Sequence, residues 1–202
     1  MHSAKELCLY LQEQGRLHSP RLIQSFYEID RKDFVPSAFA EEAYEDYPLS
    51  IGKGQTISQP STVALMLELL ELKEDDEVLD IGCGSGWTTA LLAQTVTSGS
   101  VTAVERLESL LAMAKHNVTK YHFNNVTFHQ AGEELGIPGR EFDKILVSAA
   151  APELPLTLIK QLRSGGIMVI PIDNTITVIY KKEEDTFEKR VLHGFVFVPL
   201  IY

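Results

Sequence analysis

Residues 77–87 read EVLDIGCGSGW, an apolar run that leads directly into three glycines at alternate positions. The run is typical of a buried strand. Gly82, Gly84 and Gly86 let the backbone turn sharply and approach a ligand closely, ahead of a helix that we expect from Thr88. The stretch therefore predicts the first strand–loop–helix unit of an α/β sheet, with a ligand site in its loop.

Similar units follow towards the C-terminus, where short apolar segments alternate with helical ones. This alternation is typical of a mostly parallel, doubly wound sheet with helices on both faces. We expect its strands at residues 77–81, 100–105, 126–130, 144–150 and 167–172. The segments 175–182 and 190–202 flank a charged turn at residues 183–185 without an intervening helix. They predict an antiparallel hairpin that closes the edge of a seven-stranded, Rossmann-like α/β sheet.

The residues before this sheet have a helical pattern. Ser19 followed by Pro20 is typical of a helix start. A later helix has an apolar stripe formed by Val63, Met66, Leu67 and Leu70. We expect residues 1–72 to form a helical extension with an active-site loop, residues 73–202 to form the sheet, and residues 1–202 to be one domain.

Composition restricts the class of partner. Of the 202 residues 18 are basic and 28 acidic, which gives a formal net charge of −10 and argues against binding to nucleic acid or to a membrane surface. Cys8 and Cys83 are too few for a disulfide framework, and this favours a reducing, cytoplasmic location. The six histidines lack the spacing of metal ligands, so we expect no metal site. We expect a monomer.

The glycine loop and an acid after it indicate the kind of cofactor. The glycines have the spacing G-x-G-x-G, and Trp87 stands where a dinucleotide fingerprint has its third glycine or alanine. Glu105, 19 residues beyond Gly86, ends the second strand, where an acid can hydrogen-bond ribose hydroxyls. The pattern favours a single nucleoside such as S-adenosylmethionine; the alternative is a glycine-rich turn beside a surface acid.

Longer stretches resemble a known family. VLDIGCGSG resembles motif I of class I S-adenosylmethionine-dependent methyltransferases, and VTAVER is similar to the segment that carries their ribose acid. From about Arg31 to Leu200, the segments RKDFVP, AYEDYPLSIGKGQTISQP, SAAAP, QLRSGGIMVIPI and FVPL together resemble the protein-L-isoaspartate O-methyltransferases. The resemblance implies methyl transfer from S-adenosyl-L-methionine to the α-carboxyl of L-isoaspartyl residues in damaged proteins or peptides.

The resemblance also implies which residues form the site. Ser58 corresponds to the family's active-site serine, and Val198, Pro199 and Leu200 would hold the substrate peptide by backbone contacts. The residues that would bind the cofactor are Thr56, Ile57, Ser58, Asp80, Gly82, Cys83, Gly84, Ser85, Glu105, Arg106, Ala131 and Gly132. Without the resemblance, residues 198–200 would be interpreted as the end of an edge strand and Ser58 as a helix cap, although Ser61 is the cap that we expect.

The expected chemistry agrees with a carboxylate acceptor. The end of the fourth strand reads SAAAP, which contains no acid and no Asn/Asp-Pro-Pro-aromatic run of the kind found in base N-methyltransferases. A carboxyl group has a pKa of about 4 and is already ionised at neutral pH, so it needs no base. We expect the Gly-Lys-Gly segment at residues 52–54 to fold over the cofactor.

One position departs from the family pattern. Ala131 stands where the family has an aspartate that typically meets the adenine amino group. Adenine would then be held by the backbone alone or reached by Glu133. The departure leaves two alternatives open: methylation of another carboxylate or small substrate, and a non-catalytic protein that binds S-adenosylmethionine.

Overall fold

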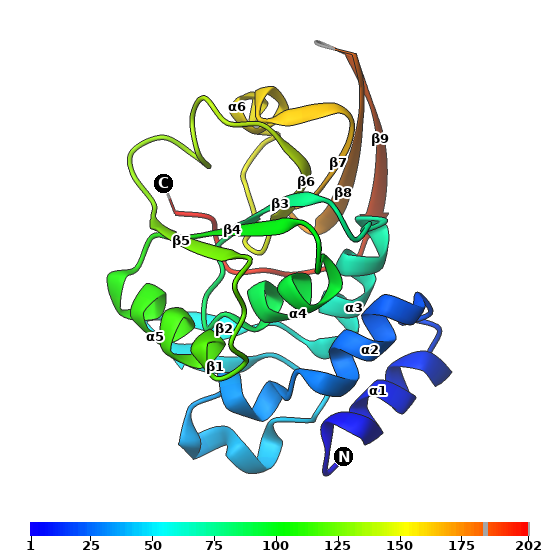
Figure 1. Cartoon of the computed structure of the whole chain (residues 1–202), viewed down its shortest axis with the longest axis vertical. Coiled ribbons are helices and arrows are strands. Elements are labelled where there is room, and N and C mark those ends of the chain that lie inside the picture. Colours follow the sequence, from blue (N-terminus) through cyan, green and yellow to red (C-terminus); the bar gives the residue numbers. More distant parts are fainter. Residues whose placement is uncertain (184–185, 202) are drawn as a thin grey trace.

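The computed structural model describes residues 1–183 and 186–201, and in it seven strands form one sheet in the order β5-β4-β3-β6-β7-β8-β9 (Figure 1). The strands are β3 (Glu77–Ile81), β4 (Ser100–Glu105), β5 (Val126–Gln130), β6 (Phe142–Val147), β7 (Leu162–Ile172), β8 (Thr175–Glu183) and β9 (Thr186–His193). Strands β3 to β7 are parallel, and β8 and β9 are antiparallel to their neighbours. The predicted sheet is confirmed, and residues 184 and 185 of the expected charged turn lie outside the described residues.

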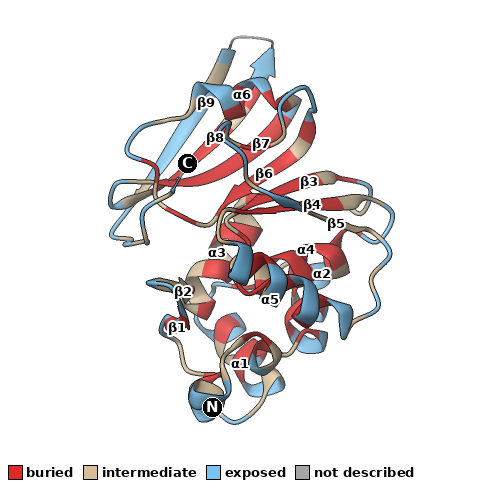
Figure 2. Cartoon of the chain, turned by 90° about the vertical axis from the view of Figure 1, so that its left-hand side faces the viewer, coloured by how far each residue is buried: buried red, intermediate tan, exposed pale blue. Residues whose placement is uncertain are grey.

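Helices cover the two faces of the sheet unequally. Helices α4 (Trp87–Thr95) and α5 (Glu108–Thr119) lie on one face with the N-terminal helices, and the short α6 (Leu156–Lys160) lies on the other (Figures 1 and 2). Neighbouring residues of a strand point to opposite faces, so Val78 belongs to the core beside α4 whereas Leu79 belongs to the core beside α6. Burial on both faces explains why the inner strands are almost continuously apolar.

The N-terminal extension consists of α1 (Ala4–Glu13), α2 (Pro20–Glu28) and α3 (Pro60–Leu69), with 3₁₀ turns at Arg31–Phe34 and Ser37–Glu42. A two-stranded hairpin, β1 (Leu49–Gly52) and β2 (Gln55–Ile57), precedes α3. Lys53 and Gly54 form the turn of this hairpin, and all three residues of the Gly-Lys-Gly segment have positive φ. We expected only a loop there, because the two strands are short and their pattern is interrupted by glycine.

The C-terminal segment corrects the edge-strand interpretation of residues 198–200. Strand β9 ends at His193, and the chain then returns over the carboxyl ends of the parallel strands (Figure 1, red). The Ala150 N–H donates to the Val198 carbonyl and the Leu200 N–H donates to the Ala150 carbonyl, each at 2.8 Å. Gly194, with φ of 93°, lets the backbone leave the β8–β9 ladder.

Candidate active site

The glycine loop between β3 and α4 turns through three residues in the left-handed region. The φ angles are 75° at Gly82, 56° at Gly84 and 92° at Gly86. The Gly82 N–H donates to the Val104 carbonyl at 2.8 Å, which ties the start of the loop to the end of β4. A Cβ on Gly82 would have no neighbour within 4 Å, so a ligand can approach the backbone there.

Glu105 fixes the loop from the end of the adjacent strand. Its Oε2 accepts the Gly84 N–H at 2.9 Å, and its Oε1 accepts the Leu107 N–H at 2.9 Å. The residue is only 6% exposed. Each carboxylate oxygen can accept more than one hydrogen bond, so Glu105 can hold the loop and still accept from ribose hydroxyls.

Asp80 lies beneath the glycine loop. It is not among the residues that line the cleft at the carboxyl ends of β3, β4 and β6, where the other predicted cofactor residues lie. Its Oδ2 accepts hydrogen bonds from the hydroxyls of Thr89 at 2.6 Å and Thr88 at 3.1 Å. Its Oδ1 is buried without a hydrogen-bond partner among the described residues. Burial raises the pKa of Asp80 from its ordinary value of 3.8 to about 6; the two threonines act against this shift and Glu105 adds to it. Asp80 therefore anchors the start of α4 to β3.

We expect Asp80→Asn to change how stability depends on pH. The folded protein protonates Asp80 at a pH of about 6 and the unfolded chain does so near 3.8, so ionised Asp80 costs stability as the pH rises between these values. The difference between these two pKa values lowers the free energy of unfolding by an amount on the order of 3 kcal/mol above pH 6. Urea unfolding at pH 4, 5, 6 and 7 should show the variant gaining stability relative to the wild type as the pH rises. If the difference in the free energy of unfolding between the variant and the wild type stays constant with pH, this account is contradicted.

A cleft opens at the carboxyl ends of β3, β4 and β6, and most of the predicted site residues lie along it. These residues are Thr56, Ile57, Ser58, Gly82, Cys83, Gly84, Ser85, Glu105, Arg106, Ala131, Gly132, Val198, Pro199 and Leu200. The hairpin residues Ile51 and Gln55, the helix residue Trp87 and the segment 148–149 also line the cleft. The sequence did not single these residues out as ligand contacts, because most of them have apolar or small side chains that carry no chemical signature of a site.

The loop from β5 to β6 forms one wall of the cleft without containing a helix. Arg106 Nη1 donates to the Gly132 carbonyl at 2.6 Å. The Gln161 side chain accepts the Ile137 N–H at 2.7 Å and donates to the Leu135 carbonyl at 2.8 Å. The wall is thus held by the side chains of the residues that directly follow β4 and α6. Gln161 was missed, because a single glutamine at a helix end gives no hint of contacts 24 to 26 residues away.

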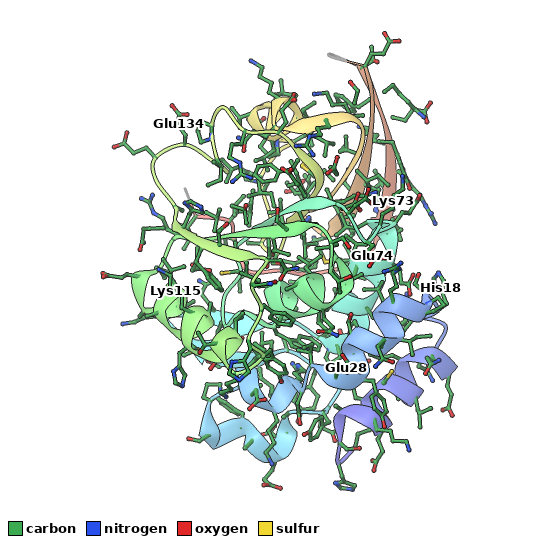
Figure 3. The ribbon with its side chains drawn as sticks, in the orientation of Figure 1. His18, Glu28, Lys73, Glu74, Lys115 and Glu134 are labelled. Carbon is green, nitrogen blue, oxygen red and sulfur yellow. The ribbon has the colours of Figure 1, made fainter. Side chains whose placement is uncertain are left out.

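The same loop corrects one expectation about its acids. Ala131 lines the cleft, and its N–H donates to the Glu105 carbonyl at 2.9 Å. Glu134, and not Glu133, is the glutamate of this loop that lines the cleft. Figure 3 labels Glu134 on the segment that follows β5. This wall therefore offers a ligand the Glu134 carboxylate and parts of the backbone of residues 131–136.

Ser58 lies between β2 and α3 and does not cap the helix. The N-cap residue of α3 is Gln59, which makes no side-chain cap bond. Asp46 satisfies the first turn instead, since its Oδ1 accepts the Ser61 N–H at 2.8 Å. The expectation that Ser61 caps α3 is therefore wrong. No group of the described residues hydrogen-bonds the Ser58 hydroxyl, and Ser58 lines the cleft.

Three further observations concern metals, membranes and thiols. Within residues 1–183 and 186–201, no group of three or more His, Cys, Asp or Glu residues is arranged to hold a metal ion. No helix in these ranges has the length and apolar character needed to cross a membrane. Cys8 and Cys83 are both free and buried, and burial raises the pKa of each thiol.

Comparisons with known proteins identify the family. The model of the protein-L-isoaspartate (D-aspartate) O-methyltransferase family matches residues 2–202. The chain is 42% identical over 205 residues to the protein-L-isoaspartate O-methyltransferase of Aliivibrio salmonicida, covering 100% of this chain and 97% of the relative. It is 41% identical over 198 residues to that of Petrotoga mobilis, covering 95% and 92%.

Among solved structures, a similar fold is found in a Plasmodium falciparum beta-aspartate methyltransferase in complex with S-adenosyl-L-homocysteine. The TM-score is 0.88 and the identity is 25%, with 100% of this chain and 99% of that chain covered. The match therefore includes the N-terminal helices and the returning C-terminal segment as well as the sheet. Together with the family model and the two relatives, it shows that the chain belongs to the protein-L-isoaspartate (D-aspartate) O-methyltransferase family.

Proposed function

We propose that the protein transfers a methyl group from S-adenosyl-L-methionine to the α-carboxyl of L-isoaspartyl residues in damaged proteins and peptides, and so takes part in protein repair. One observation carries the proposal: a single cleft is lined by the glycine loop and Glu105 and also by Ser58 and residues 198–200. In this proposal the cofactor site and the acceptor site adjoin each other.

The residues present fit an adenosyl cofactor. The glycine loop offers open backbone at Gly82, and Glu105 offers a carboxylate at the end of β4. Ala131, Gly132 and Glu134, which line the cleft after β5, would face the base. When bound there, S-adenosyl-L-methionine supplies a methyl group on a positively charged sulfur. A carboxylate oxygen can accept this methyl group directly, because the carboxylate has no proton to lose first.

The lining of the cleft agrees with an acceptor that arrives already ionised. Among the described residues, the carboxylates along it are Glu105 and Glu134, which belong to β4 and to the β5–β6 loop, and no histidine lines it. Ser58 and the alanines of the SAAAP segment offer no base. The protein's task is then to align the carboxylate and exclude water, and well-oriented reactants can contribute roughly 7 to 11 kcal/mol towards the barrier.

Ser58→Ala is expected to lower turnover on an isoaspartyl peptide by about 10- to 100-fold, because the proposed hydrogen bond from Ser58 aligns the acceptor carboxylate with the methyl group, and alignment can lower the barrier by several kcal/mol. The dissociation constant of S-adenosyl-L-homocysteine, measured by calorimetry, should change by less than about threefold, since the glycine loop and Glu105 are intact. Ser50→Ala, at an exposed position in β1 of the same hairpin, is the matched control and should keep wild-type turnover. Unchanged turnover in Ser58→Ala would remove Ser58 from the mechanism.

The nature of the product tests the proposed function. Incubation with an isoaspartyl peptide and methyl-labelled S-adenosyl-L-methionine should give a methyl ester on the peptide. Mild base should release the label as methanol, because esters hydrolyse readily and N-methyl groups do not. Label that survives base would place the methyl group on nitrogen and would contradict a carboxyl acceptor.

We further propose that the chain acts as a monomeric, single-domain enzyme in the cytoplasm, on protein substrates and not on nucleic acid. The net charge of −10 and the two free cysteines support this proposal. Light scattering of the purified protein, which should give the mass of one chain, tests the oligomeric state.

A further inference from the structure

We propose that Arg31 is a positioning residue that holds the Ser58 segment against the glycine-loop side of the cleft. The inference rests on the proposed function, because it assigns Arg31 a role in aligning the two halves of that site. From the sequence, Arg31 has no role beyond its place at the start of the RKDFVP segment. Its actual position follows from contacts with residues 12 to 27 positions away.

The guanidinium of Arg31 binds the backbone of the whole segment that leads to Ser58. Nη1 donates to the carbonyls of Ala43 at 2.8 Å and Glu45 at 3.3 Å. Nη2 donates to the carbonyls of Tyr47 and Ser58, each at 3.1 Å. One side chain therefore fixes both ends of residues 43–58, which include the β1–β2 hairpin.

The same guanidinium reaches the other half of the cleft. Its Cζ lies 5.3 Å from the centre of the Trp87 ring, in a cation–π contact. Trp87 is the first residue of α4, directly after Gly86, and it lines the cleft. Phe26 packs edge-on against the same ring at 5.6 Å, so the ring is held on more than one side. Arg31 thus joins the segment of residues 43–58 to the start of α4.

The surroundings of Arg31 require an arginine. The residue is 1% exposed, and no carboxylate among the described residues forms an ion pair with it. Burial lowers the pKa of Arg31 to about 10, and Asp46 and Tyr47 act in the opposite direction, so the group stays charged at neutral pH. A planar guanidinium can serve several carbonyls and lie over a ring at once, whereas the ammonium of lysine is a compact point charge.

The test compares Arg31→Lys with a matched control, Arg163→Lys. Arg163 also uses both Nη atoms, donating to Asp143 at 2.7 Å and Glu77 at 3.0 Å, but it does not line the cleft. Measured well below each melting temperature, Arg31→Lys should lower kcat on an isoaspartyl peptide at least tenfold. Its dissociation constant for S-adenosyl-L-homocysteine should stay within about threefold of the wild type. Arg163→Lys should lower only the melting temperature.

Trp87 provides a readout that does not depend on turnover. It is the only tryptophan in the sequence, so the intrinsic tryptophan fluorescence reports the surroundings of this one ring, which include Arg31. Its emission should change in Arg31→Lys and stay unchanged in Arg163→Lys. If the proposed function were wrong, the peptide would not be methylated even by the wild type, while the change in emission would remain.

A purely stabilising role would overturn the inference. Its signature would be an Arg31→Lys variant with a lower melting temperature, wild-type kcat and wild-type Trp87 emission. Should that variant fail to fold, hydrogen exchange of the wild type decides the matter without any substitution. Protection of the amides of residues 43–58, comparable to that of α4, supports the inference, and rapid exchange of that segment in the folded protein overturns it.

Discussion

Replacing Glu105 with alanine should weaken the binding of S-adenosyl-L-homocysteine by at least about 100-fold. A hydrogen bond to a charged group contributes about 1.5 to 3 kcal/mol, and every 1.4 kcal/mol corresponds to a tenfold change in the dissociation constant. Glu105→Ala removes the proposed acceptor for the ribose hydroxyls. It also frees the N–H groups of Gly84 and Leu107, which the carboxylate holds at 2.9 Å in the structure. Losing the ribose contact and the support of the glycine loop together should weaken binding more than losing either one alone.

Calorimetry with two further variants makes this prediction specific. Glu105→Gln keeps the shape and one acceptor oxygen of the side chain, so it should fall between the wild type and Glu105→Ala. Glu108 is exposed in the first turn of α5 and does not line the cleft, so Glu108→Ala should bind like the wild type. If the dissociation constant of Glu105→Ala stays within threefold of the wild type, Glu105 does not bind the cofactor.

Gly86→Ala should destabilise the fold by about 3 kcal/mol or more. A left-handed backbone costs a residue with a Cβ roughly 1 to 2 kcal/mol. At Gly86, where φ is 92°, the new Cβ would also lie 3.0 Å from Val118 and 3.1 Å from the backbone of Ala114 in α5. Helix α5 would have to move away from α4. For a chain of this size, such a loss lowers the melting temperature by on the order of 10 °C.

A second glycine, Gly139, separates the cost of the left-handed backbone from the cost of the clash with α5. Its φ is 80°, but an added Cβ would have no neighbour within 4 Å. Gly139→Ala should therefore show the backbone cost alone and lower the melting temperature by only a few degrees. Equal losses in Gly86→Ala and Gly139→Ala, measured by calorimetric unfolding, would mean that the packing of α4 against α5 does not require glycine at position 86.

The sheet and its glycine loop could be predicted because their signals are local. Each inner strand is buried on both faces and is therefore an apolar run, and the glycine spacing follows from three residues with positive φ. The β1–β2 hairpin could not be recognised in the same way. Its strands are four and three residues long, and tertiary contacts with Arg31 hold the segment that contains it.

Residues whose role depends on distant partners were also missed. Arg31 and Gln161 are buried polar side chains that bind the backbone of other segments, and no periodicity in the sequence shows which segments these are. The position of residues 198–200 depends on pairing with Ala150, about fifty residues earlier. From the sequence, only the resemblance placed these three residues at the substrate site.

The central claim is that this cleft delivers a methyl group to the α-carboxyl of an isoaspartyl residue and distinguishes it from an ordinary aspartyl residue. The most direct test is the ratio of kcat/KM for two peptides of identical sequence, one with L-isoaspartate and one with L-aspartate at the same position. We expect base-labile methylation of the isoaspartyl peptide and a ratio of at least about 1000, which corresponds to roughly 4 kcal/mol of discrimination. Equal rates for the two peptides, or no methylation of either by a protein that binds S-adenosyl-L-homocysteine, would contradict the claim.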